Sequence, residues 1–214
     1  MNKLVDTTGS EARRLPAEWQ SGIAMARKYA TSGPRYTSYP TAPQFSDDFD
    51  VQRYLNWQVF KERHADPLSI YVHLPFCHDI CYYCACNKVV TRREGVARRY
   101  LDHLGRELAL QSEIVGAERP VTQLHWGGGT PTFLDDGEIT ELMHGLASHF
   151  RLLDKGYREY SIEIDPRTVS PSTIALLKGV GFNRISLGVQ DFDERVQRAV
   201  NRIQPFEQVA DLVE

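Results

Sequence analysis

The 214-residue sequence lacks a long apolar run, a large excess of either charge, and any cysteine outside one short segment. Without about 20 consecutive apolar residues, no membrane-spanning helix is expected. A net charge of −3 does not provide the basic surface typical of nucleic-acid binding. The N-terminal residues MNKLVDTTGSEARRLP contain no apolar segment of the kind found in signal peptides. These absences predict a cytoplasmic protein that binds neither membrane nor nucleic acid.

All four cysteines lie within residues 77–86, which read CHDICYYCAC. Because the cytoplasm keeps thiols reduced, a disulfide framework is a poor interpretation of this segment. Cys77, Cys81 and Cys84 have the spacing C-x3-C-x2-C, and Cys86 follows closely. Structural zinc usually takes two separated pairs of ligands, so a single crowded loop argues against zinc, which stays open as an alternative. Thiolates also hold iron–sulfur clusters, and three ligands on a four-iron cluster leave one iron free for catalysis.

From Leu68 onward, short apolar segments alternate with segments of helical periodicity. Strands are expected at 68–74, 121–126, 160–165 and 184–189, and helices at 95–115, 135–150, 170–180, 193–200 and from Pro205. This alternation predicts an α/β fold of parallel β/α units joined by right-handed crossovers. Four such units are fewer than the eight that close a TIM-like barrel.

The residues before this pattern have a different character. A short helix is expected at 17–30, followed by the proline-rich segment 33–43, which favours an extended chain. We therefore predict two parts. Residues 1–66 form an irregular and partly helical N-terminal extension, and residues 67–214 form the parallel β/α units.

The candidate ligand-binding residues lie at the ends of successive predicted strands. The cysteine segment follows the first strand, and Gly127–Gly129 ends the second. Glu163 and Asp165 close the third strand, and Gln190 follows the fourth. Parallel β/α folds bind ligands at the carboxyl ends of their strands. The order of these residues along the chain therefore predicts one shared site.

The cysteine motif after a first β-strand resembles that of the radical S-adenosylmethionine superfamily. Further segments narrow the resemblance to the oxygen-independent coproporphyrinogen III dehydrogenase (HemN) family. The similarity spans residues 30–204 and is carried by PRYTSYPTA (34–42), YVHLPFCHDICYYCACNK (71–88), LHWGGGTPT (124–132), IEIDPR (162–167) and FNRISLGVQDF (182–192).

The resemblance implies a set of cofactors and the residues that hold them. Cys77, Cys81 and Cys84 would hold a [4Fe–4S] cluster, whose fourth iron would bind one S-adenosylmethionine. A second S-adenosylmethionine is implied as well. The implied binding residues are Tyr71, Gly128, Gly129, Thr130 and Glu163 for the first molecule, and Tyr83, Gln190 and Arg202 for the second.

The function implied by the resemblance is the oxidative decarboxylation of coproporphyrinogen III to protoporphyrinogen IX in haem biosynthesis. A 5′-deoxyadenosyl radical would take hydrogen from a propionate side chain, and loss of carbon dioxide and one electron would leave a vinyl group. The reaction needs an electron donor and an electron acceptor, and the intact enzyme is expected to be a monomer.

Two other functions of the same family are weighed against this one: a haem chaperone and another HemN-like radical enzyme. Cys86 and the segment 34–42 both favour the dehydrogenase, because the chaperones generally lack them. Cys86 is not expected to be a fourth ligand, since it would close the iron that S-adenosylmethionine must reach.

Members of the family are considerably longer than 214 residues, and this sequence ends within a helical pattern. We therefore expect an N-terminal portion of a HemN-like enzyme that is inactive by itself, in which residues 67–214 form the incomplete N-terminal part of a TIM-like radical-SAM barrel.

Overall fold

The computed structural model describes residues 17–30, 40–58, 66–93 and 95–213. The chain divides into two compact units, residues 1–49 and residues 50–214. The first unit contains helix α1 (Ala17–Tyr29), where a helix was expected, and the short 3-10 helix η1 (Ala42–Gln44). Most of the segment 34–42 lies outside the described residues. The second unit carries the site.

The predicted boundary between residues 66 and 67 stays a prediction, since it adjoins residues 59–65, which lie outside the described part of the chain. Helix α2 (Val51–Gln58) precedes these residues and belongs to the second unit. Its Tyr54 hydroxyl donates a hydrogen bond of 2.5 Å to the Gln111 side chain of helix α3 (Val96–Val115).

A parallel sheet forms the centre of the second unit, as expected. Its strand order is β1-β4-β6-β7, and the short β5 (Arg151–Leu152) pairs with the start of β4. Every pairing between these strands is parallel. The long strands are β1 (Leu68–Leu74), β4 (Pro120–Gly128), β6 (Glu159–Ile164) and β7 (Arg184–Leu187). Within the described residues the sheet is open, with β1 and β7 at its edges.

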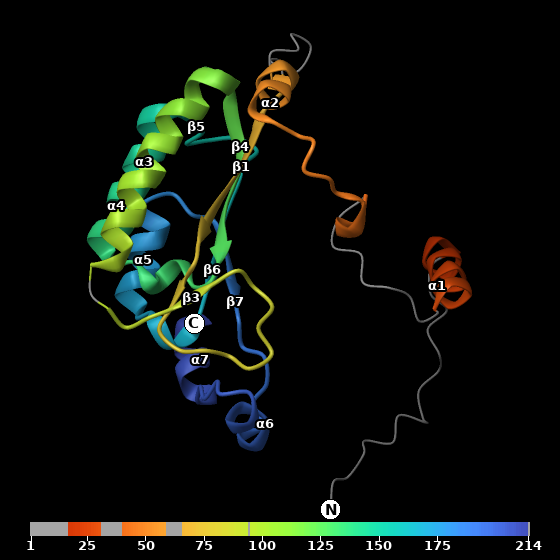
Figure 1. Cartoon of the computed structure of the whole chain (residues 1–214). Helices are drawn as coiled ribbons and strands as arrows, with labels where there is room; N and C mark the ends of the chain where they lie inside the picture. The colour runs from red at the N-terminus through yellow and green to blue at the C-terminus, as the bar shows by residue number, and fades with distance from the viewer. Residues whose placement is uncertain (1–16, 31–39, 59–65, 94, 214) are drawn as a thin grey trace, which may run out of the picture. The chain divides into compact units, whose positions relative to one another are not determined.

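Three helices cover one face of this sheet (Figure 1). They are α3, α4 (Asp136–His149) and α5 (Pro171–Gly179). The last two begin at capping boxes, in which Asp135 and Ser170 accept hydrogen bonds from backbone N–H groups of the first turn. The core between sheet and helices is built from alternate strand residues, including the fully buried Trp126 and Ile162.

The opposite face of the sheet is more polar. Tyr71, His73, His125, Ser161 and Glu163 occupy the intervening positions of β1, β4 and β6, and each stays partly exposed or hydrogen-bonded. Because side chains alternate along a strand, one face packs against the helices and the other remains available to a ligand. Among the described helices, none is long and apolar enough to cross a membrane.

One strand runs further than the sequence predicts. Strand β4 was expected to end before Gly127 but continues through Gly128, because these glycines pair with His73 and Leu74 of β1. A Cβ at Gly128 would lie 2.7 Å from the His73 ring, and the φ of 117° there is one that side chains rarely permit. Glycine therefore lets β4 stay paired with β1 up to the site.

Two further helices follow the sheet: α6 (Glu194–Ala199) and α7 (Phe206–Val213). Both agree with the helices expected near 193–200 and from Pro205. The short strands β2 (Phe76–Cys77) and β3 (Val89–Val90) pair with each other and were not expected, because two residues are too few to show a period.

Candidate functional site

The cysteine loop is closed at its base by the pairing of β2 with β3. Thr91 donates its backbone N–H to the Cys77 carbonyl at 2.9 Å, and Val89 donates to the Pro75 carbonyl at 2.7 Å. Within the loop, the Lys88 ammonium donates to the Cys84 carbonyl at 3.0 Å. These bonds bring both ends of the loop together at the carboxyl end of β1.

The far side of the loop is held by residues much later in the sequence. Tyr82 donates its N–H to the Val200 carbonyl at 3.1 Å, and the Asn201 amide donates to the Ile80 carbonyl at 2.8 Å. Asn201 adopts a left-handed φ of 55°, which asparagine tolerates better than most residues. The loop is thus fixed between the end of β1 and the end of α6.

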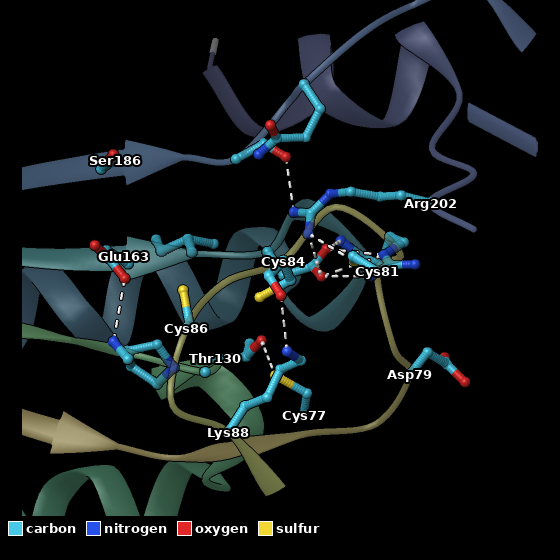
Figure 2. Close-up of a pocket in the computed structure, with 18 of the residues that line it drawn as sticks. Cys77, Asp79, Cys81, Cys84, Cys86, Lys88, Thr130, Glu163, Ser186 and Arg202 are labelled. Carbon is cyan, nitrogen blue, oxygen red and sulfur yellow. Dashed lines mark hydrogen bonds and ion pairs between the residues drawn. The ribbon is translucent and has the colours of Figure 1, made fainter. Parts of the chain in front are cut away.

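A cavity of about 270 Å³ lies against this loop, at the carboxyl ends of the strands (Figure 2). All four cysteines line it. So do the predicted cofactor-binding residues with one exception: Tyr83, Gly128, Gly129, Thr130, Glu163, Gln190 and Arg202. The structure therefore brings together residues that come from the ends of β1, β4, β6 and β7, as the order of the motifs predicts.

The exception is Tyr71, which does not line this cavity. Its ring stacks on His125 with centroids 5.7 Å apart, and its hydroxyl lies 3.0 Å from Nδ1 of His73. Partial burial raises the pKa of Tyr71, and the negative charge of Glu163 raises it further. Tyr71 thus lies on the polar face of the sheet beside the cavity, and its role there stays a prediction.

The glycines at the end of β4 are required by the protein's own packing. A Cβ at Gly129 would lie 2.6 Å from the Pro75 carbonyl oxygen, closer than such atoms approach. The Gly129 N–H donates to the Leu74 carbonyl at 2.9 Å, and the Thr130 N–H donates to the Phe76 carbonyl at 2.8 Å. This turn therefore fixes the position of Thr130 beside the cysteine loop.

The thiols experience different surroundings. Burial raises the pKa of Cys77, while a hydrogen bond with the Thr130 hydroxyl, at 3.5 Å, opposes the rise. Burial also acts to raise the pKa of Cys84, but hydrogen bonds from Cys86 and the charge of Lys88 outweigh it and lower that pKa. The pKa of Cys86 is raised, first by burial and then by its contact with Cys84.

Glu163 is oriented by two contacts at the end of β6. Its Oε2 accepts a hydrogen bond from the Gly128 N–H at 3.2 Å, and its Oε1 lies 3.5 Å from Nε2 of His125. Its side chain is nevertheless 47% exposed. The carboxylate therefore keeps hydrogen-bonding capacity toward the cavity.

Sequence reasoning missed an ionic cluster in the wall of the cavity. Asp165 lies 2.7 Å from Arg167 and 3.3 Å from Arg202, and its side chain is only 7% exposed. Burial alone would raise the pKa of Asp165, but the hydrogen bonds from Arg167 and the charge of Arg202 together lower it. The segment IEIDPR could have indicated this ionic cluster, because it places Asp165 and Arg167 two residues apart.

The donor set fits an iron–sulfur cluster. The three predicted ligands line one cavity, and cysteine thiolates are the usual protein ligands of such clusters. Structural zinc usually takes two separated pairs of ligands, so three cysteines within one loop favour the cluster.

Comparison with known proteins now defines the class. Residues 71–214 match the family model described as the Radical SAM superfamily, and the chain belongs to that superfamily. Members of this class use a [4Fe–4S] cluster and S-adenosylmethionine, which agrees with the predicted cofactors.

Within the superfamily, the chain is most informatively compared with proteins named oxygen-independent coproporphyrinogen III oxidase. It is 52% identical over 190 residues to the protein of that name from Pseudomonas aeruginosa, covering 89% of this chain and 41% of the relative. Identity to the Escherichia coli protein is 49% over 185 residues, covering 86% of this chain and 39% of the relative. The predicted resemblance is confirmed.

A solved structure shows the same fold. Coproporphyrinogen III oxidase (HemN) from Escherichia coli, described as a radical SAM enzyme, matches with a TM-score of 0.78 and 46% identity. The match covers 89% of this chain and 41% of that chain. The chain thus spans about two fifths of the length of these relatives, and the fold prediction of an unclosed β/α barrel is confirmed.

Proposed function

We propose that the protein catalyses the oxygen-independent oxidative decarboxylation of coproporphyrinogen III to protoporphyrinogen IX in haem biosynthesis. The observation that carries this proposal is the convergence of three cysteines, a glycine turn and Glu163 on one cavity, in a chain 52% identical to an oxidase of that name. The relatives bear the name of the oxidase, which favours it over the haem chaperone.

Cys77, Cys81 and Cys84 are the proposed ligands of the cluster. When bound, the cluster and S-adenosylmethionine supply the radical that removes hydrogen from a propionate side chain. The chain's own contribution is to hold and shield these groups. Thr130 supports Cys77 by a hydrogen bond, and Cys86 is assigned no ligand role, so that one iron remains open.

Glu163 is the proposed partner of the ribose hydroxyls of the first S-adenosylmethionine. Its carboxylate is oriented by Gly128 and His125 and remains half exposed, so it can accept further hydrogen bonds. Acidic residues at the ends of parallel strands bind ribose in the same way in dinucleotide sites. Gly129 and Thr130 line the same cavity and are assigned to this molecule, together with Tyr71 beside it.

A second S-adenosylmethionine is proposed at Tyr83, Gln190 and Arg202. Support comes from a second cavity, of about 130 Å³, that these three residues line together. It adjoins the first cavity, since the same three residues line both. Gln190 has a left-handed φ of 67°, a conformation that is uncommon outside glycine and often found at functional sites.

The remaining partners follow from the reaction. One electron must reach the cluster from a donor, and one must leave the substrate for an acceptor. We propose that the intact enzyme works in the cytoplasm as a monomer.

The cofactor assignment is tested on the 214-residue chain. Anaerobic reconstitution should give about four irons and four sulfides per chain. The Glu163→Ala variant should keep this iron and bind S-adenosylmethionine about 10- to 100-fold more weakly, because one hydrogen bond to a charged group is lost. A dissociation constant equal to that of the wild type would remove Glu163 from the site.

The substrate assignment needs the whole catalytic domain, so it is tested in a chimera. Residues 34–214 replace the matching segment of the Escherichia coli relative, and anaerobic product analysis follows the conversion of coproporphyrinogen III. A matched chimera with Cys81→Ser is the inactive control. A chimera that holds its cluster and cleaves S-adenosylmethionine, yet leaves coproporphyrinogen III unchanged, would contradict the proposed substrate.

A further inference from the structure

The three proposed cluster ligands differ in what their side chains contact. Cys77 faces the neutral hydroxyl of Thr130, and Cys84 is held through its carbonyl by Lys88. The Cys81 sulfur instead lies 3.5 Å from Nη1 of Arg202 and 3.8 Å from Nη2 of Arg167. Among the described residues, Cys81 is thus the one cysteine whose sulfur is contacted by guanidinium groups.

A single buried carboxylate anchors both guanidinium groups. Arg167 binds Asp165 through Nε at 3.0 Å and through Nη2 at 2.7 Å, and Arg202 reaches the same carboxylate at 3.3 Å. Nη2 of Arg202 donates to the Gly188 carbonyl at 2.7 Å. Two arginines from different parts of the chain are therefore fixed in orientation toward one sulfur. Figure 2 shows Arg202 and its interactions beside Cys81.

The charges of this group do not cancel. One carboxylate faces two guanidinium groups, so the group carries a net positive charge beside Cys81. The side chains of Asp165 and Arg202 are 7% and 10% exposed, so water screens this charge little. The reduction potential of an iron–sulfur cluster depends on nearby charge, on hydrogen bonds to its sulfurs and on its exposure.

We propose that Arg167 is a positioning residue that, with Asp165 and Arg202, orients Cys81 and raises the reduction potential of the cluster bound there. The inference rests on the proposed cluster site but not on the identity of the substrate. Positive charge and hydrogen bonds to the ligand sulfur stabilise the more negative, reduced cluster. The asymmetric contacts at Cys81 thus make the electron easier to accept.

Arg167 is the residue to change, because Arg202 is also assigned to cofactor binding. The test compares the reconstituted wild-type chain with Arg167→Gln and Arg167→Lys, and with Arg98→Gln as the matched control. Arg98 is an exposed arginine that also pairs with carboxylates, Asp102 and Glu141, but lies on helix α3 away from the cysteines. Iron and sulfide content and the midpoint potential, from a redox titration followed by EPR, are the readouts.

We expect Arg167→Gln to keep its cluster but to lower the equilibrium constant for one-electron reduction about tenfold, since one charge-assisted hydrogen bond is lost. This corresponds to a midpoint potential about 59 mV lower. Arg167→Lys keeps the positive charge but lacks the planar guanidinium that contacts both Asp165 and Cys81. The midpoint potential of its cluster should therefore fall between those of the wild type and Arg167→Gln. Arg98→Gln should match the wild type.

A cluster of unchanged potential in Arg167→Gln overturns the inference. If Arg167→Gln holds no cluster, Arg167→Lys decides: a lowered potential supports the inference, and a wild-type potential, or no cluster, overturns it. A wild-type chain that holds no cluster would instead contradict the proposed site itself, so the two failures are distinguishable.

Discussion

At the scale of single residues, the site combines groups with clearly separate tasks. Three cysteines face one cavity, a threonine hydroxyl supports one of them, and a buried carboxylate gathers two arginines around another. The fourth cysteine, Cys86, lies in the same cavity and contacts Cys84. A direct comparison of variants tests whether Cys86 is a ligand or a neighbour of the cluster.

Cys86→Ser should retain the cluster, whereas Cys77→Ser, Cys81→Ser and Cys84→Ser should each lose it. The reason is that S-adenosylmethionine requires one iron without a protein ligand, as open metal sites do generally. Iron and sulfide content after anaerobic reconstitution measures the outcome. If Cys86→Ser loses as much iron as Cys81→Ser, the assignment of three ligands is wrong.

Asp165→Asn should destabilise the cluster-free protein by about 3 kcal/mol at neutral pH, because it leaves two guanidinium groups without their buried partner. That corresponds to a loss of roughly 6–12 °C in the unfolding midpoint. The lowered pKa of Asp165 means that this stabilisation is complete above the ordinary carboxyl pKa of about 4 and is lost as pH falls through the lowered value.

Thermal unfolding followed by circular dichroism at a series of pH values therefore tests both the size of this stability difference and the direction in which it changes with pH. The difference between wild type and Asp165→Asn should shrink at acidic pH. Asp102→Asn, which removes a carboxylate from an exposed pair with Arg98, should stay within about 0.5 kcal/mol of the wild type. A difference that persists unchanged below the lowered pKa would show that Asp165 does not act through its charge.

At the scale of elements, the end of strand β4 governs the site. The strand remains paired with β1 through Gly128, and the following turn sets Thr130 beside Cys77. Glycine-rich turns are often interpreted as room for a ligand. Here the same glycines make room for β1 and Pro75, so a substitution would disturb the protein before any ligand arrives.

Gly129→Ala should lower the free energy of unfolding by about 1–3 kcal/mol, because its Cβ would overlap backbone atoms of Pro75 and Phe76 that cannot move aside cheaply. The displaced turn should also reduce iron content after reconstitution. Gly105→Ala is the control: it lies on an exposed part of α3 with nothing near its Cβ, and should gain about 1 kcal/mol. Equal stabilities for the two variants would contradict this account of the turn.

Much of this architecture could be predicted from sequence, and the misses have physical reasons. The strand at 68–74 and the helices of the β/α units were found because periodicity and caps extend over many residues. Strands β2 and β3 were missed because two-residue pairings carry no pattern. The arginines at Cys81 were missed because hydrogen bonds between distant segments leave no trace in spacing, whereas the cysteine motif is local.

At the scale of the whole molecule, the described sheet has an exposed edge. Ile185 of β7 is 38% exposed, and Phe192, Ile203 and Phe206 beyond it are more exposed still. The rings of Phe192 and Phe206 meet edge to face, 5.1 Å apart. Unpaired edges and contiguous apolar surface promote association between chains.

The 214-residue chain by itself should therefore self-associate at micromolar concentration. Size-exclusion chromatography with light scattering at several concentrations measures this. Ile185→Lys should shift the chain toward monomer, since a charge on an edge strand opposes pairing. The same charge at Leu110→Lys, an exposed position on α3, should not. A monodisperse wild-type chain at every concentration would contradict the role given to this edge.

Hydrogen bonds join residues 80–82 to residues 200–202, so the cysteine loop takes its shape only when both segments are present. The partners of Ile80 and Cys81 lie 121 positions further along the chain. When the cysteines of a nascent chain leave the ribosome, the residues that hold the cysteine loop in position have therefore not yet been synthesised. The geometry around Cys81 therefore forms only after the segment around Arg202 has emerged from the ribosome and docked, and a cluster that requires this geometry would be loaded after that step.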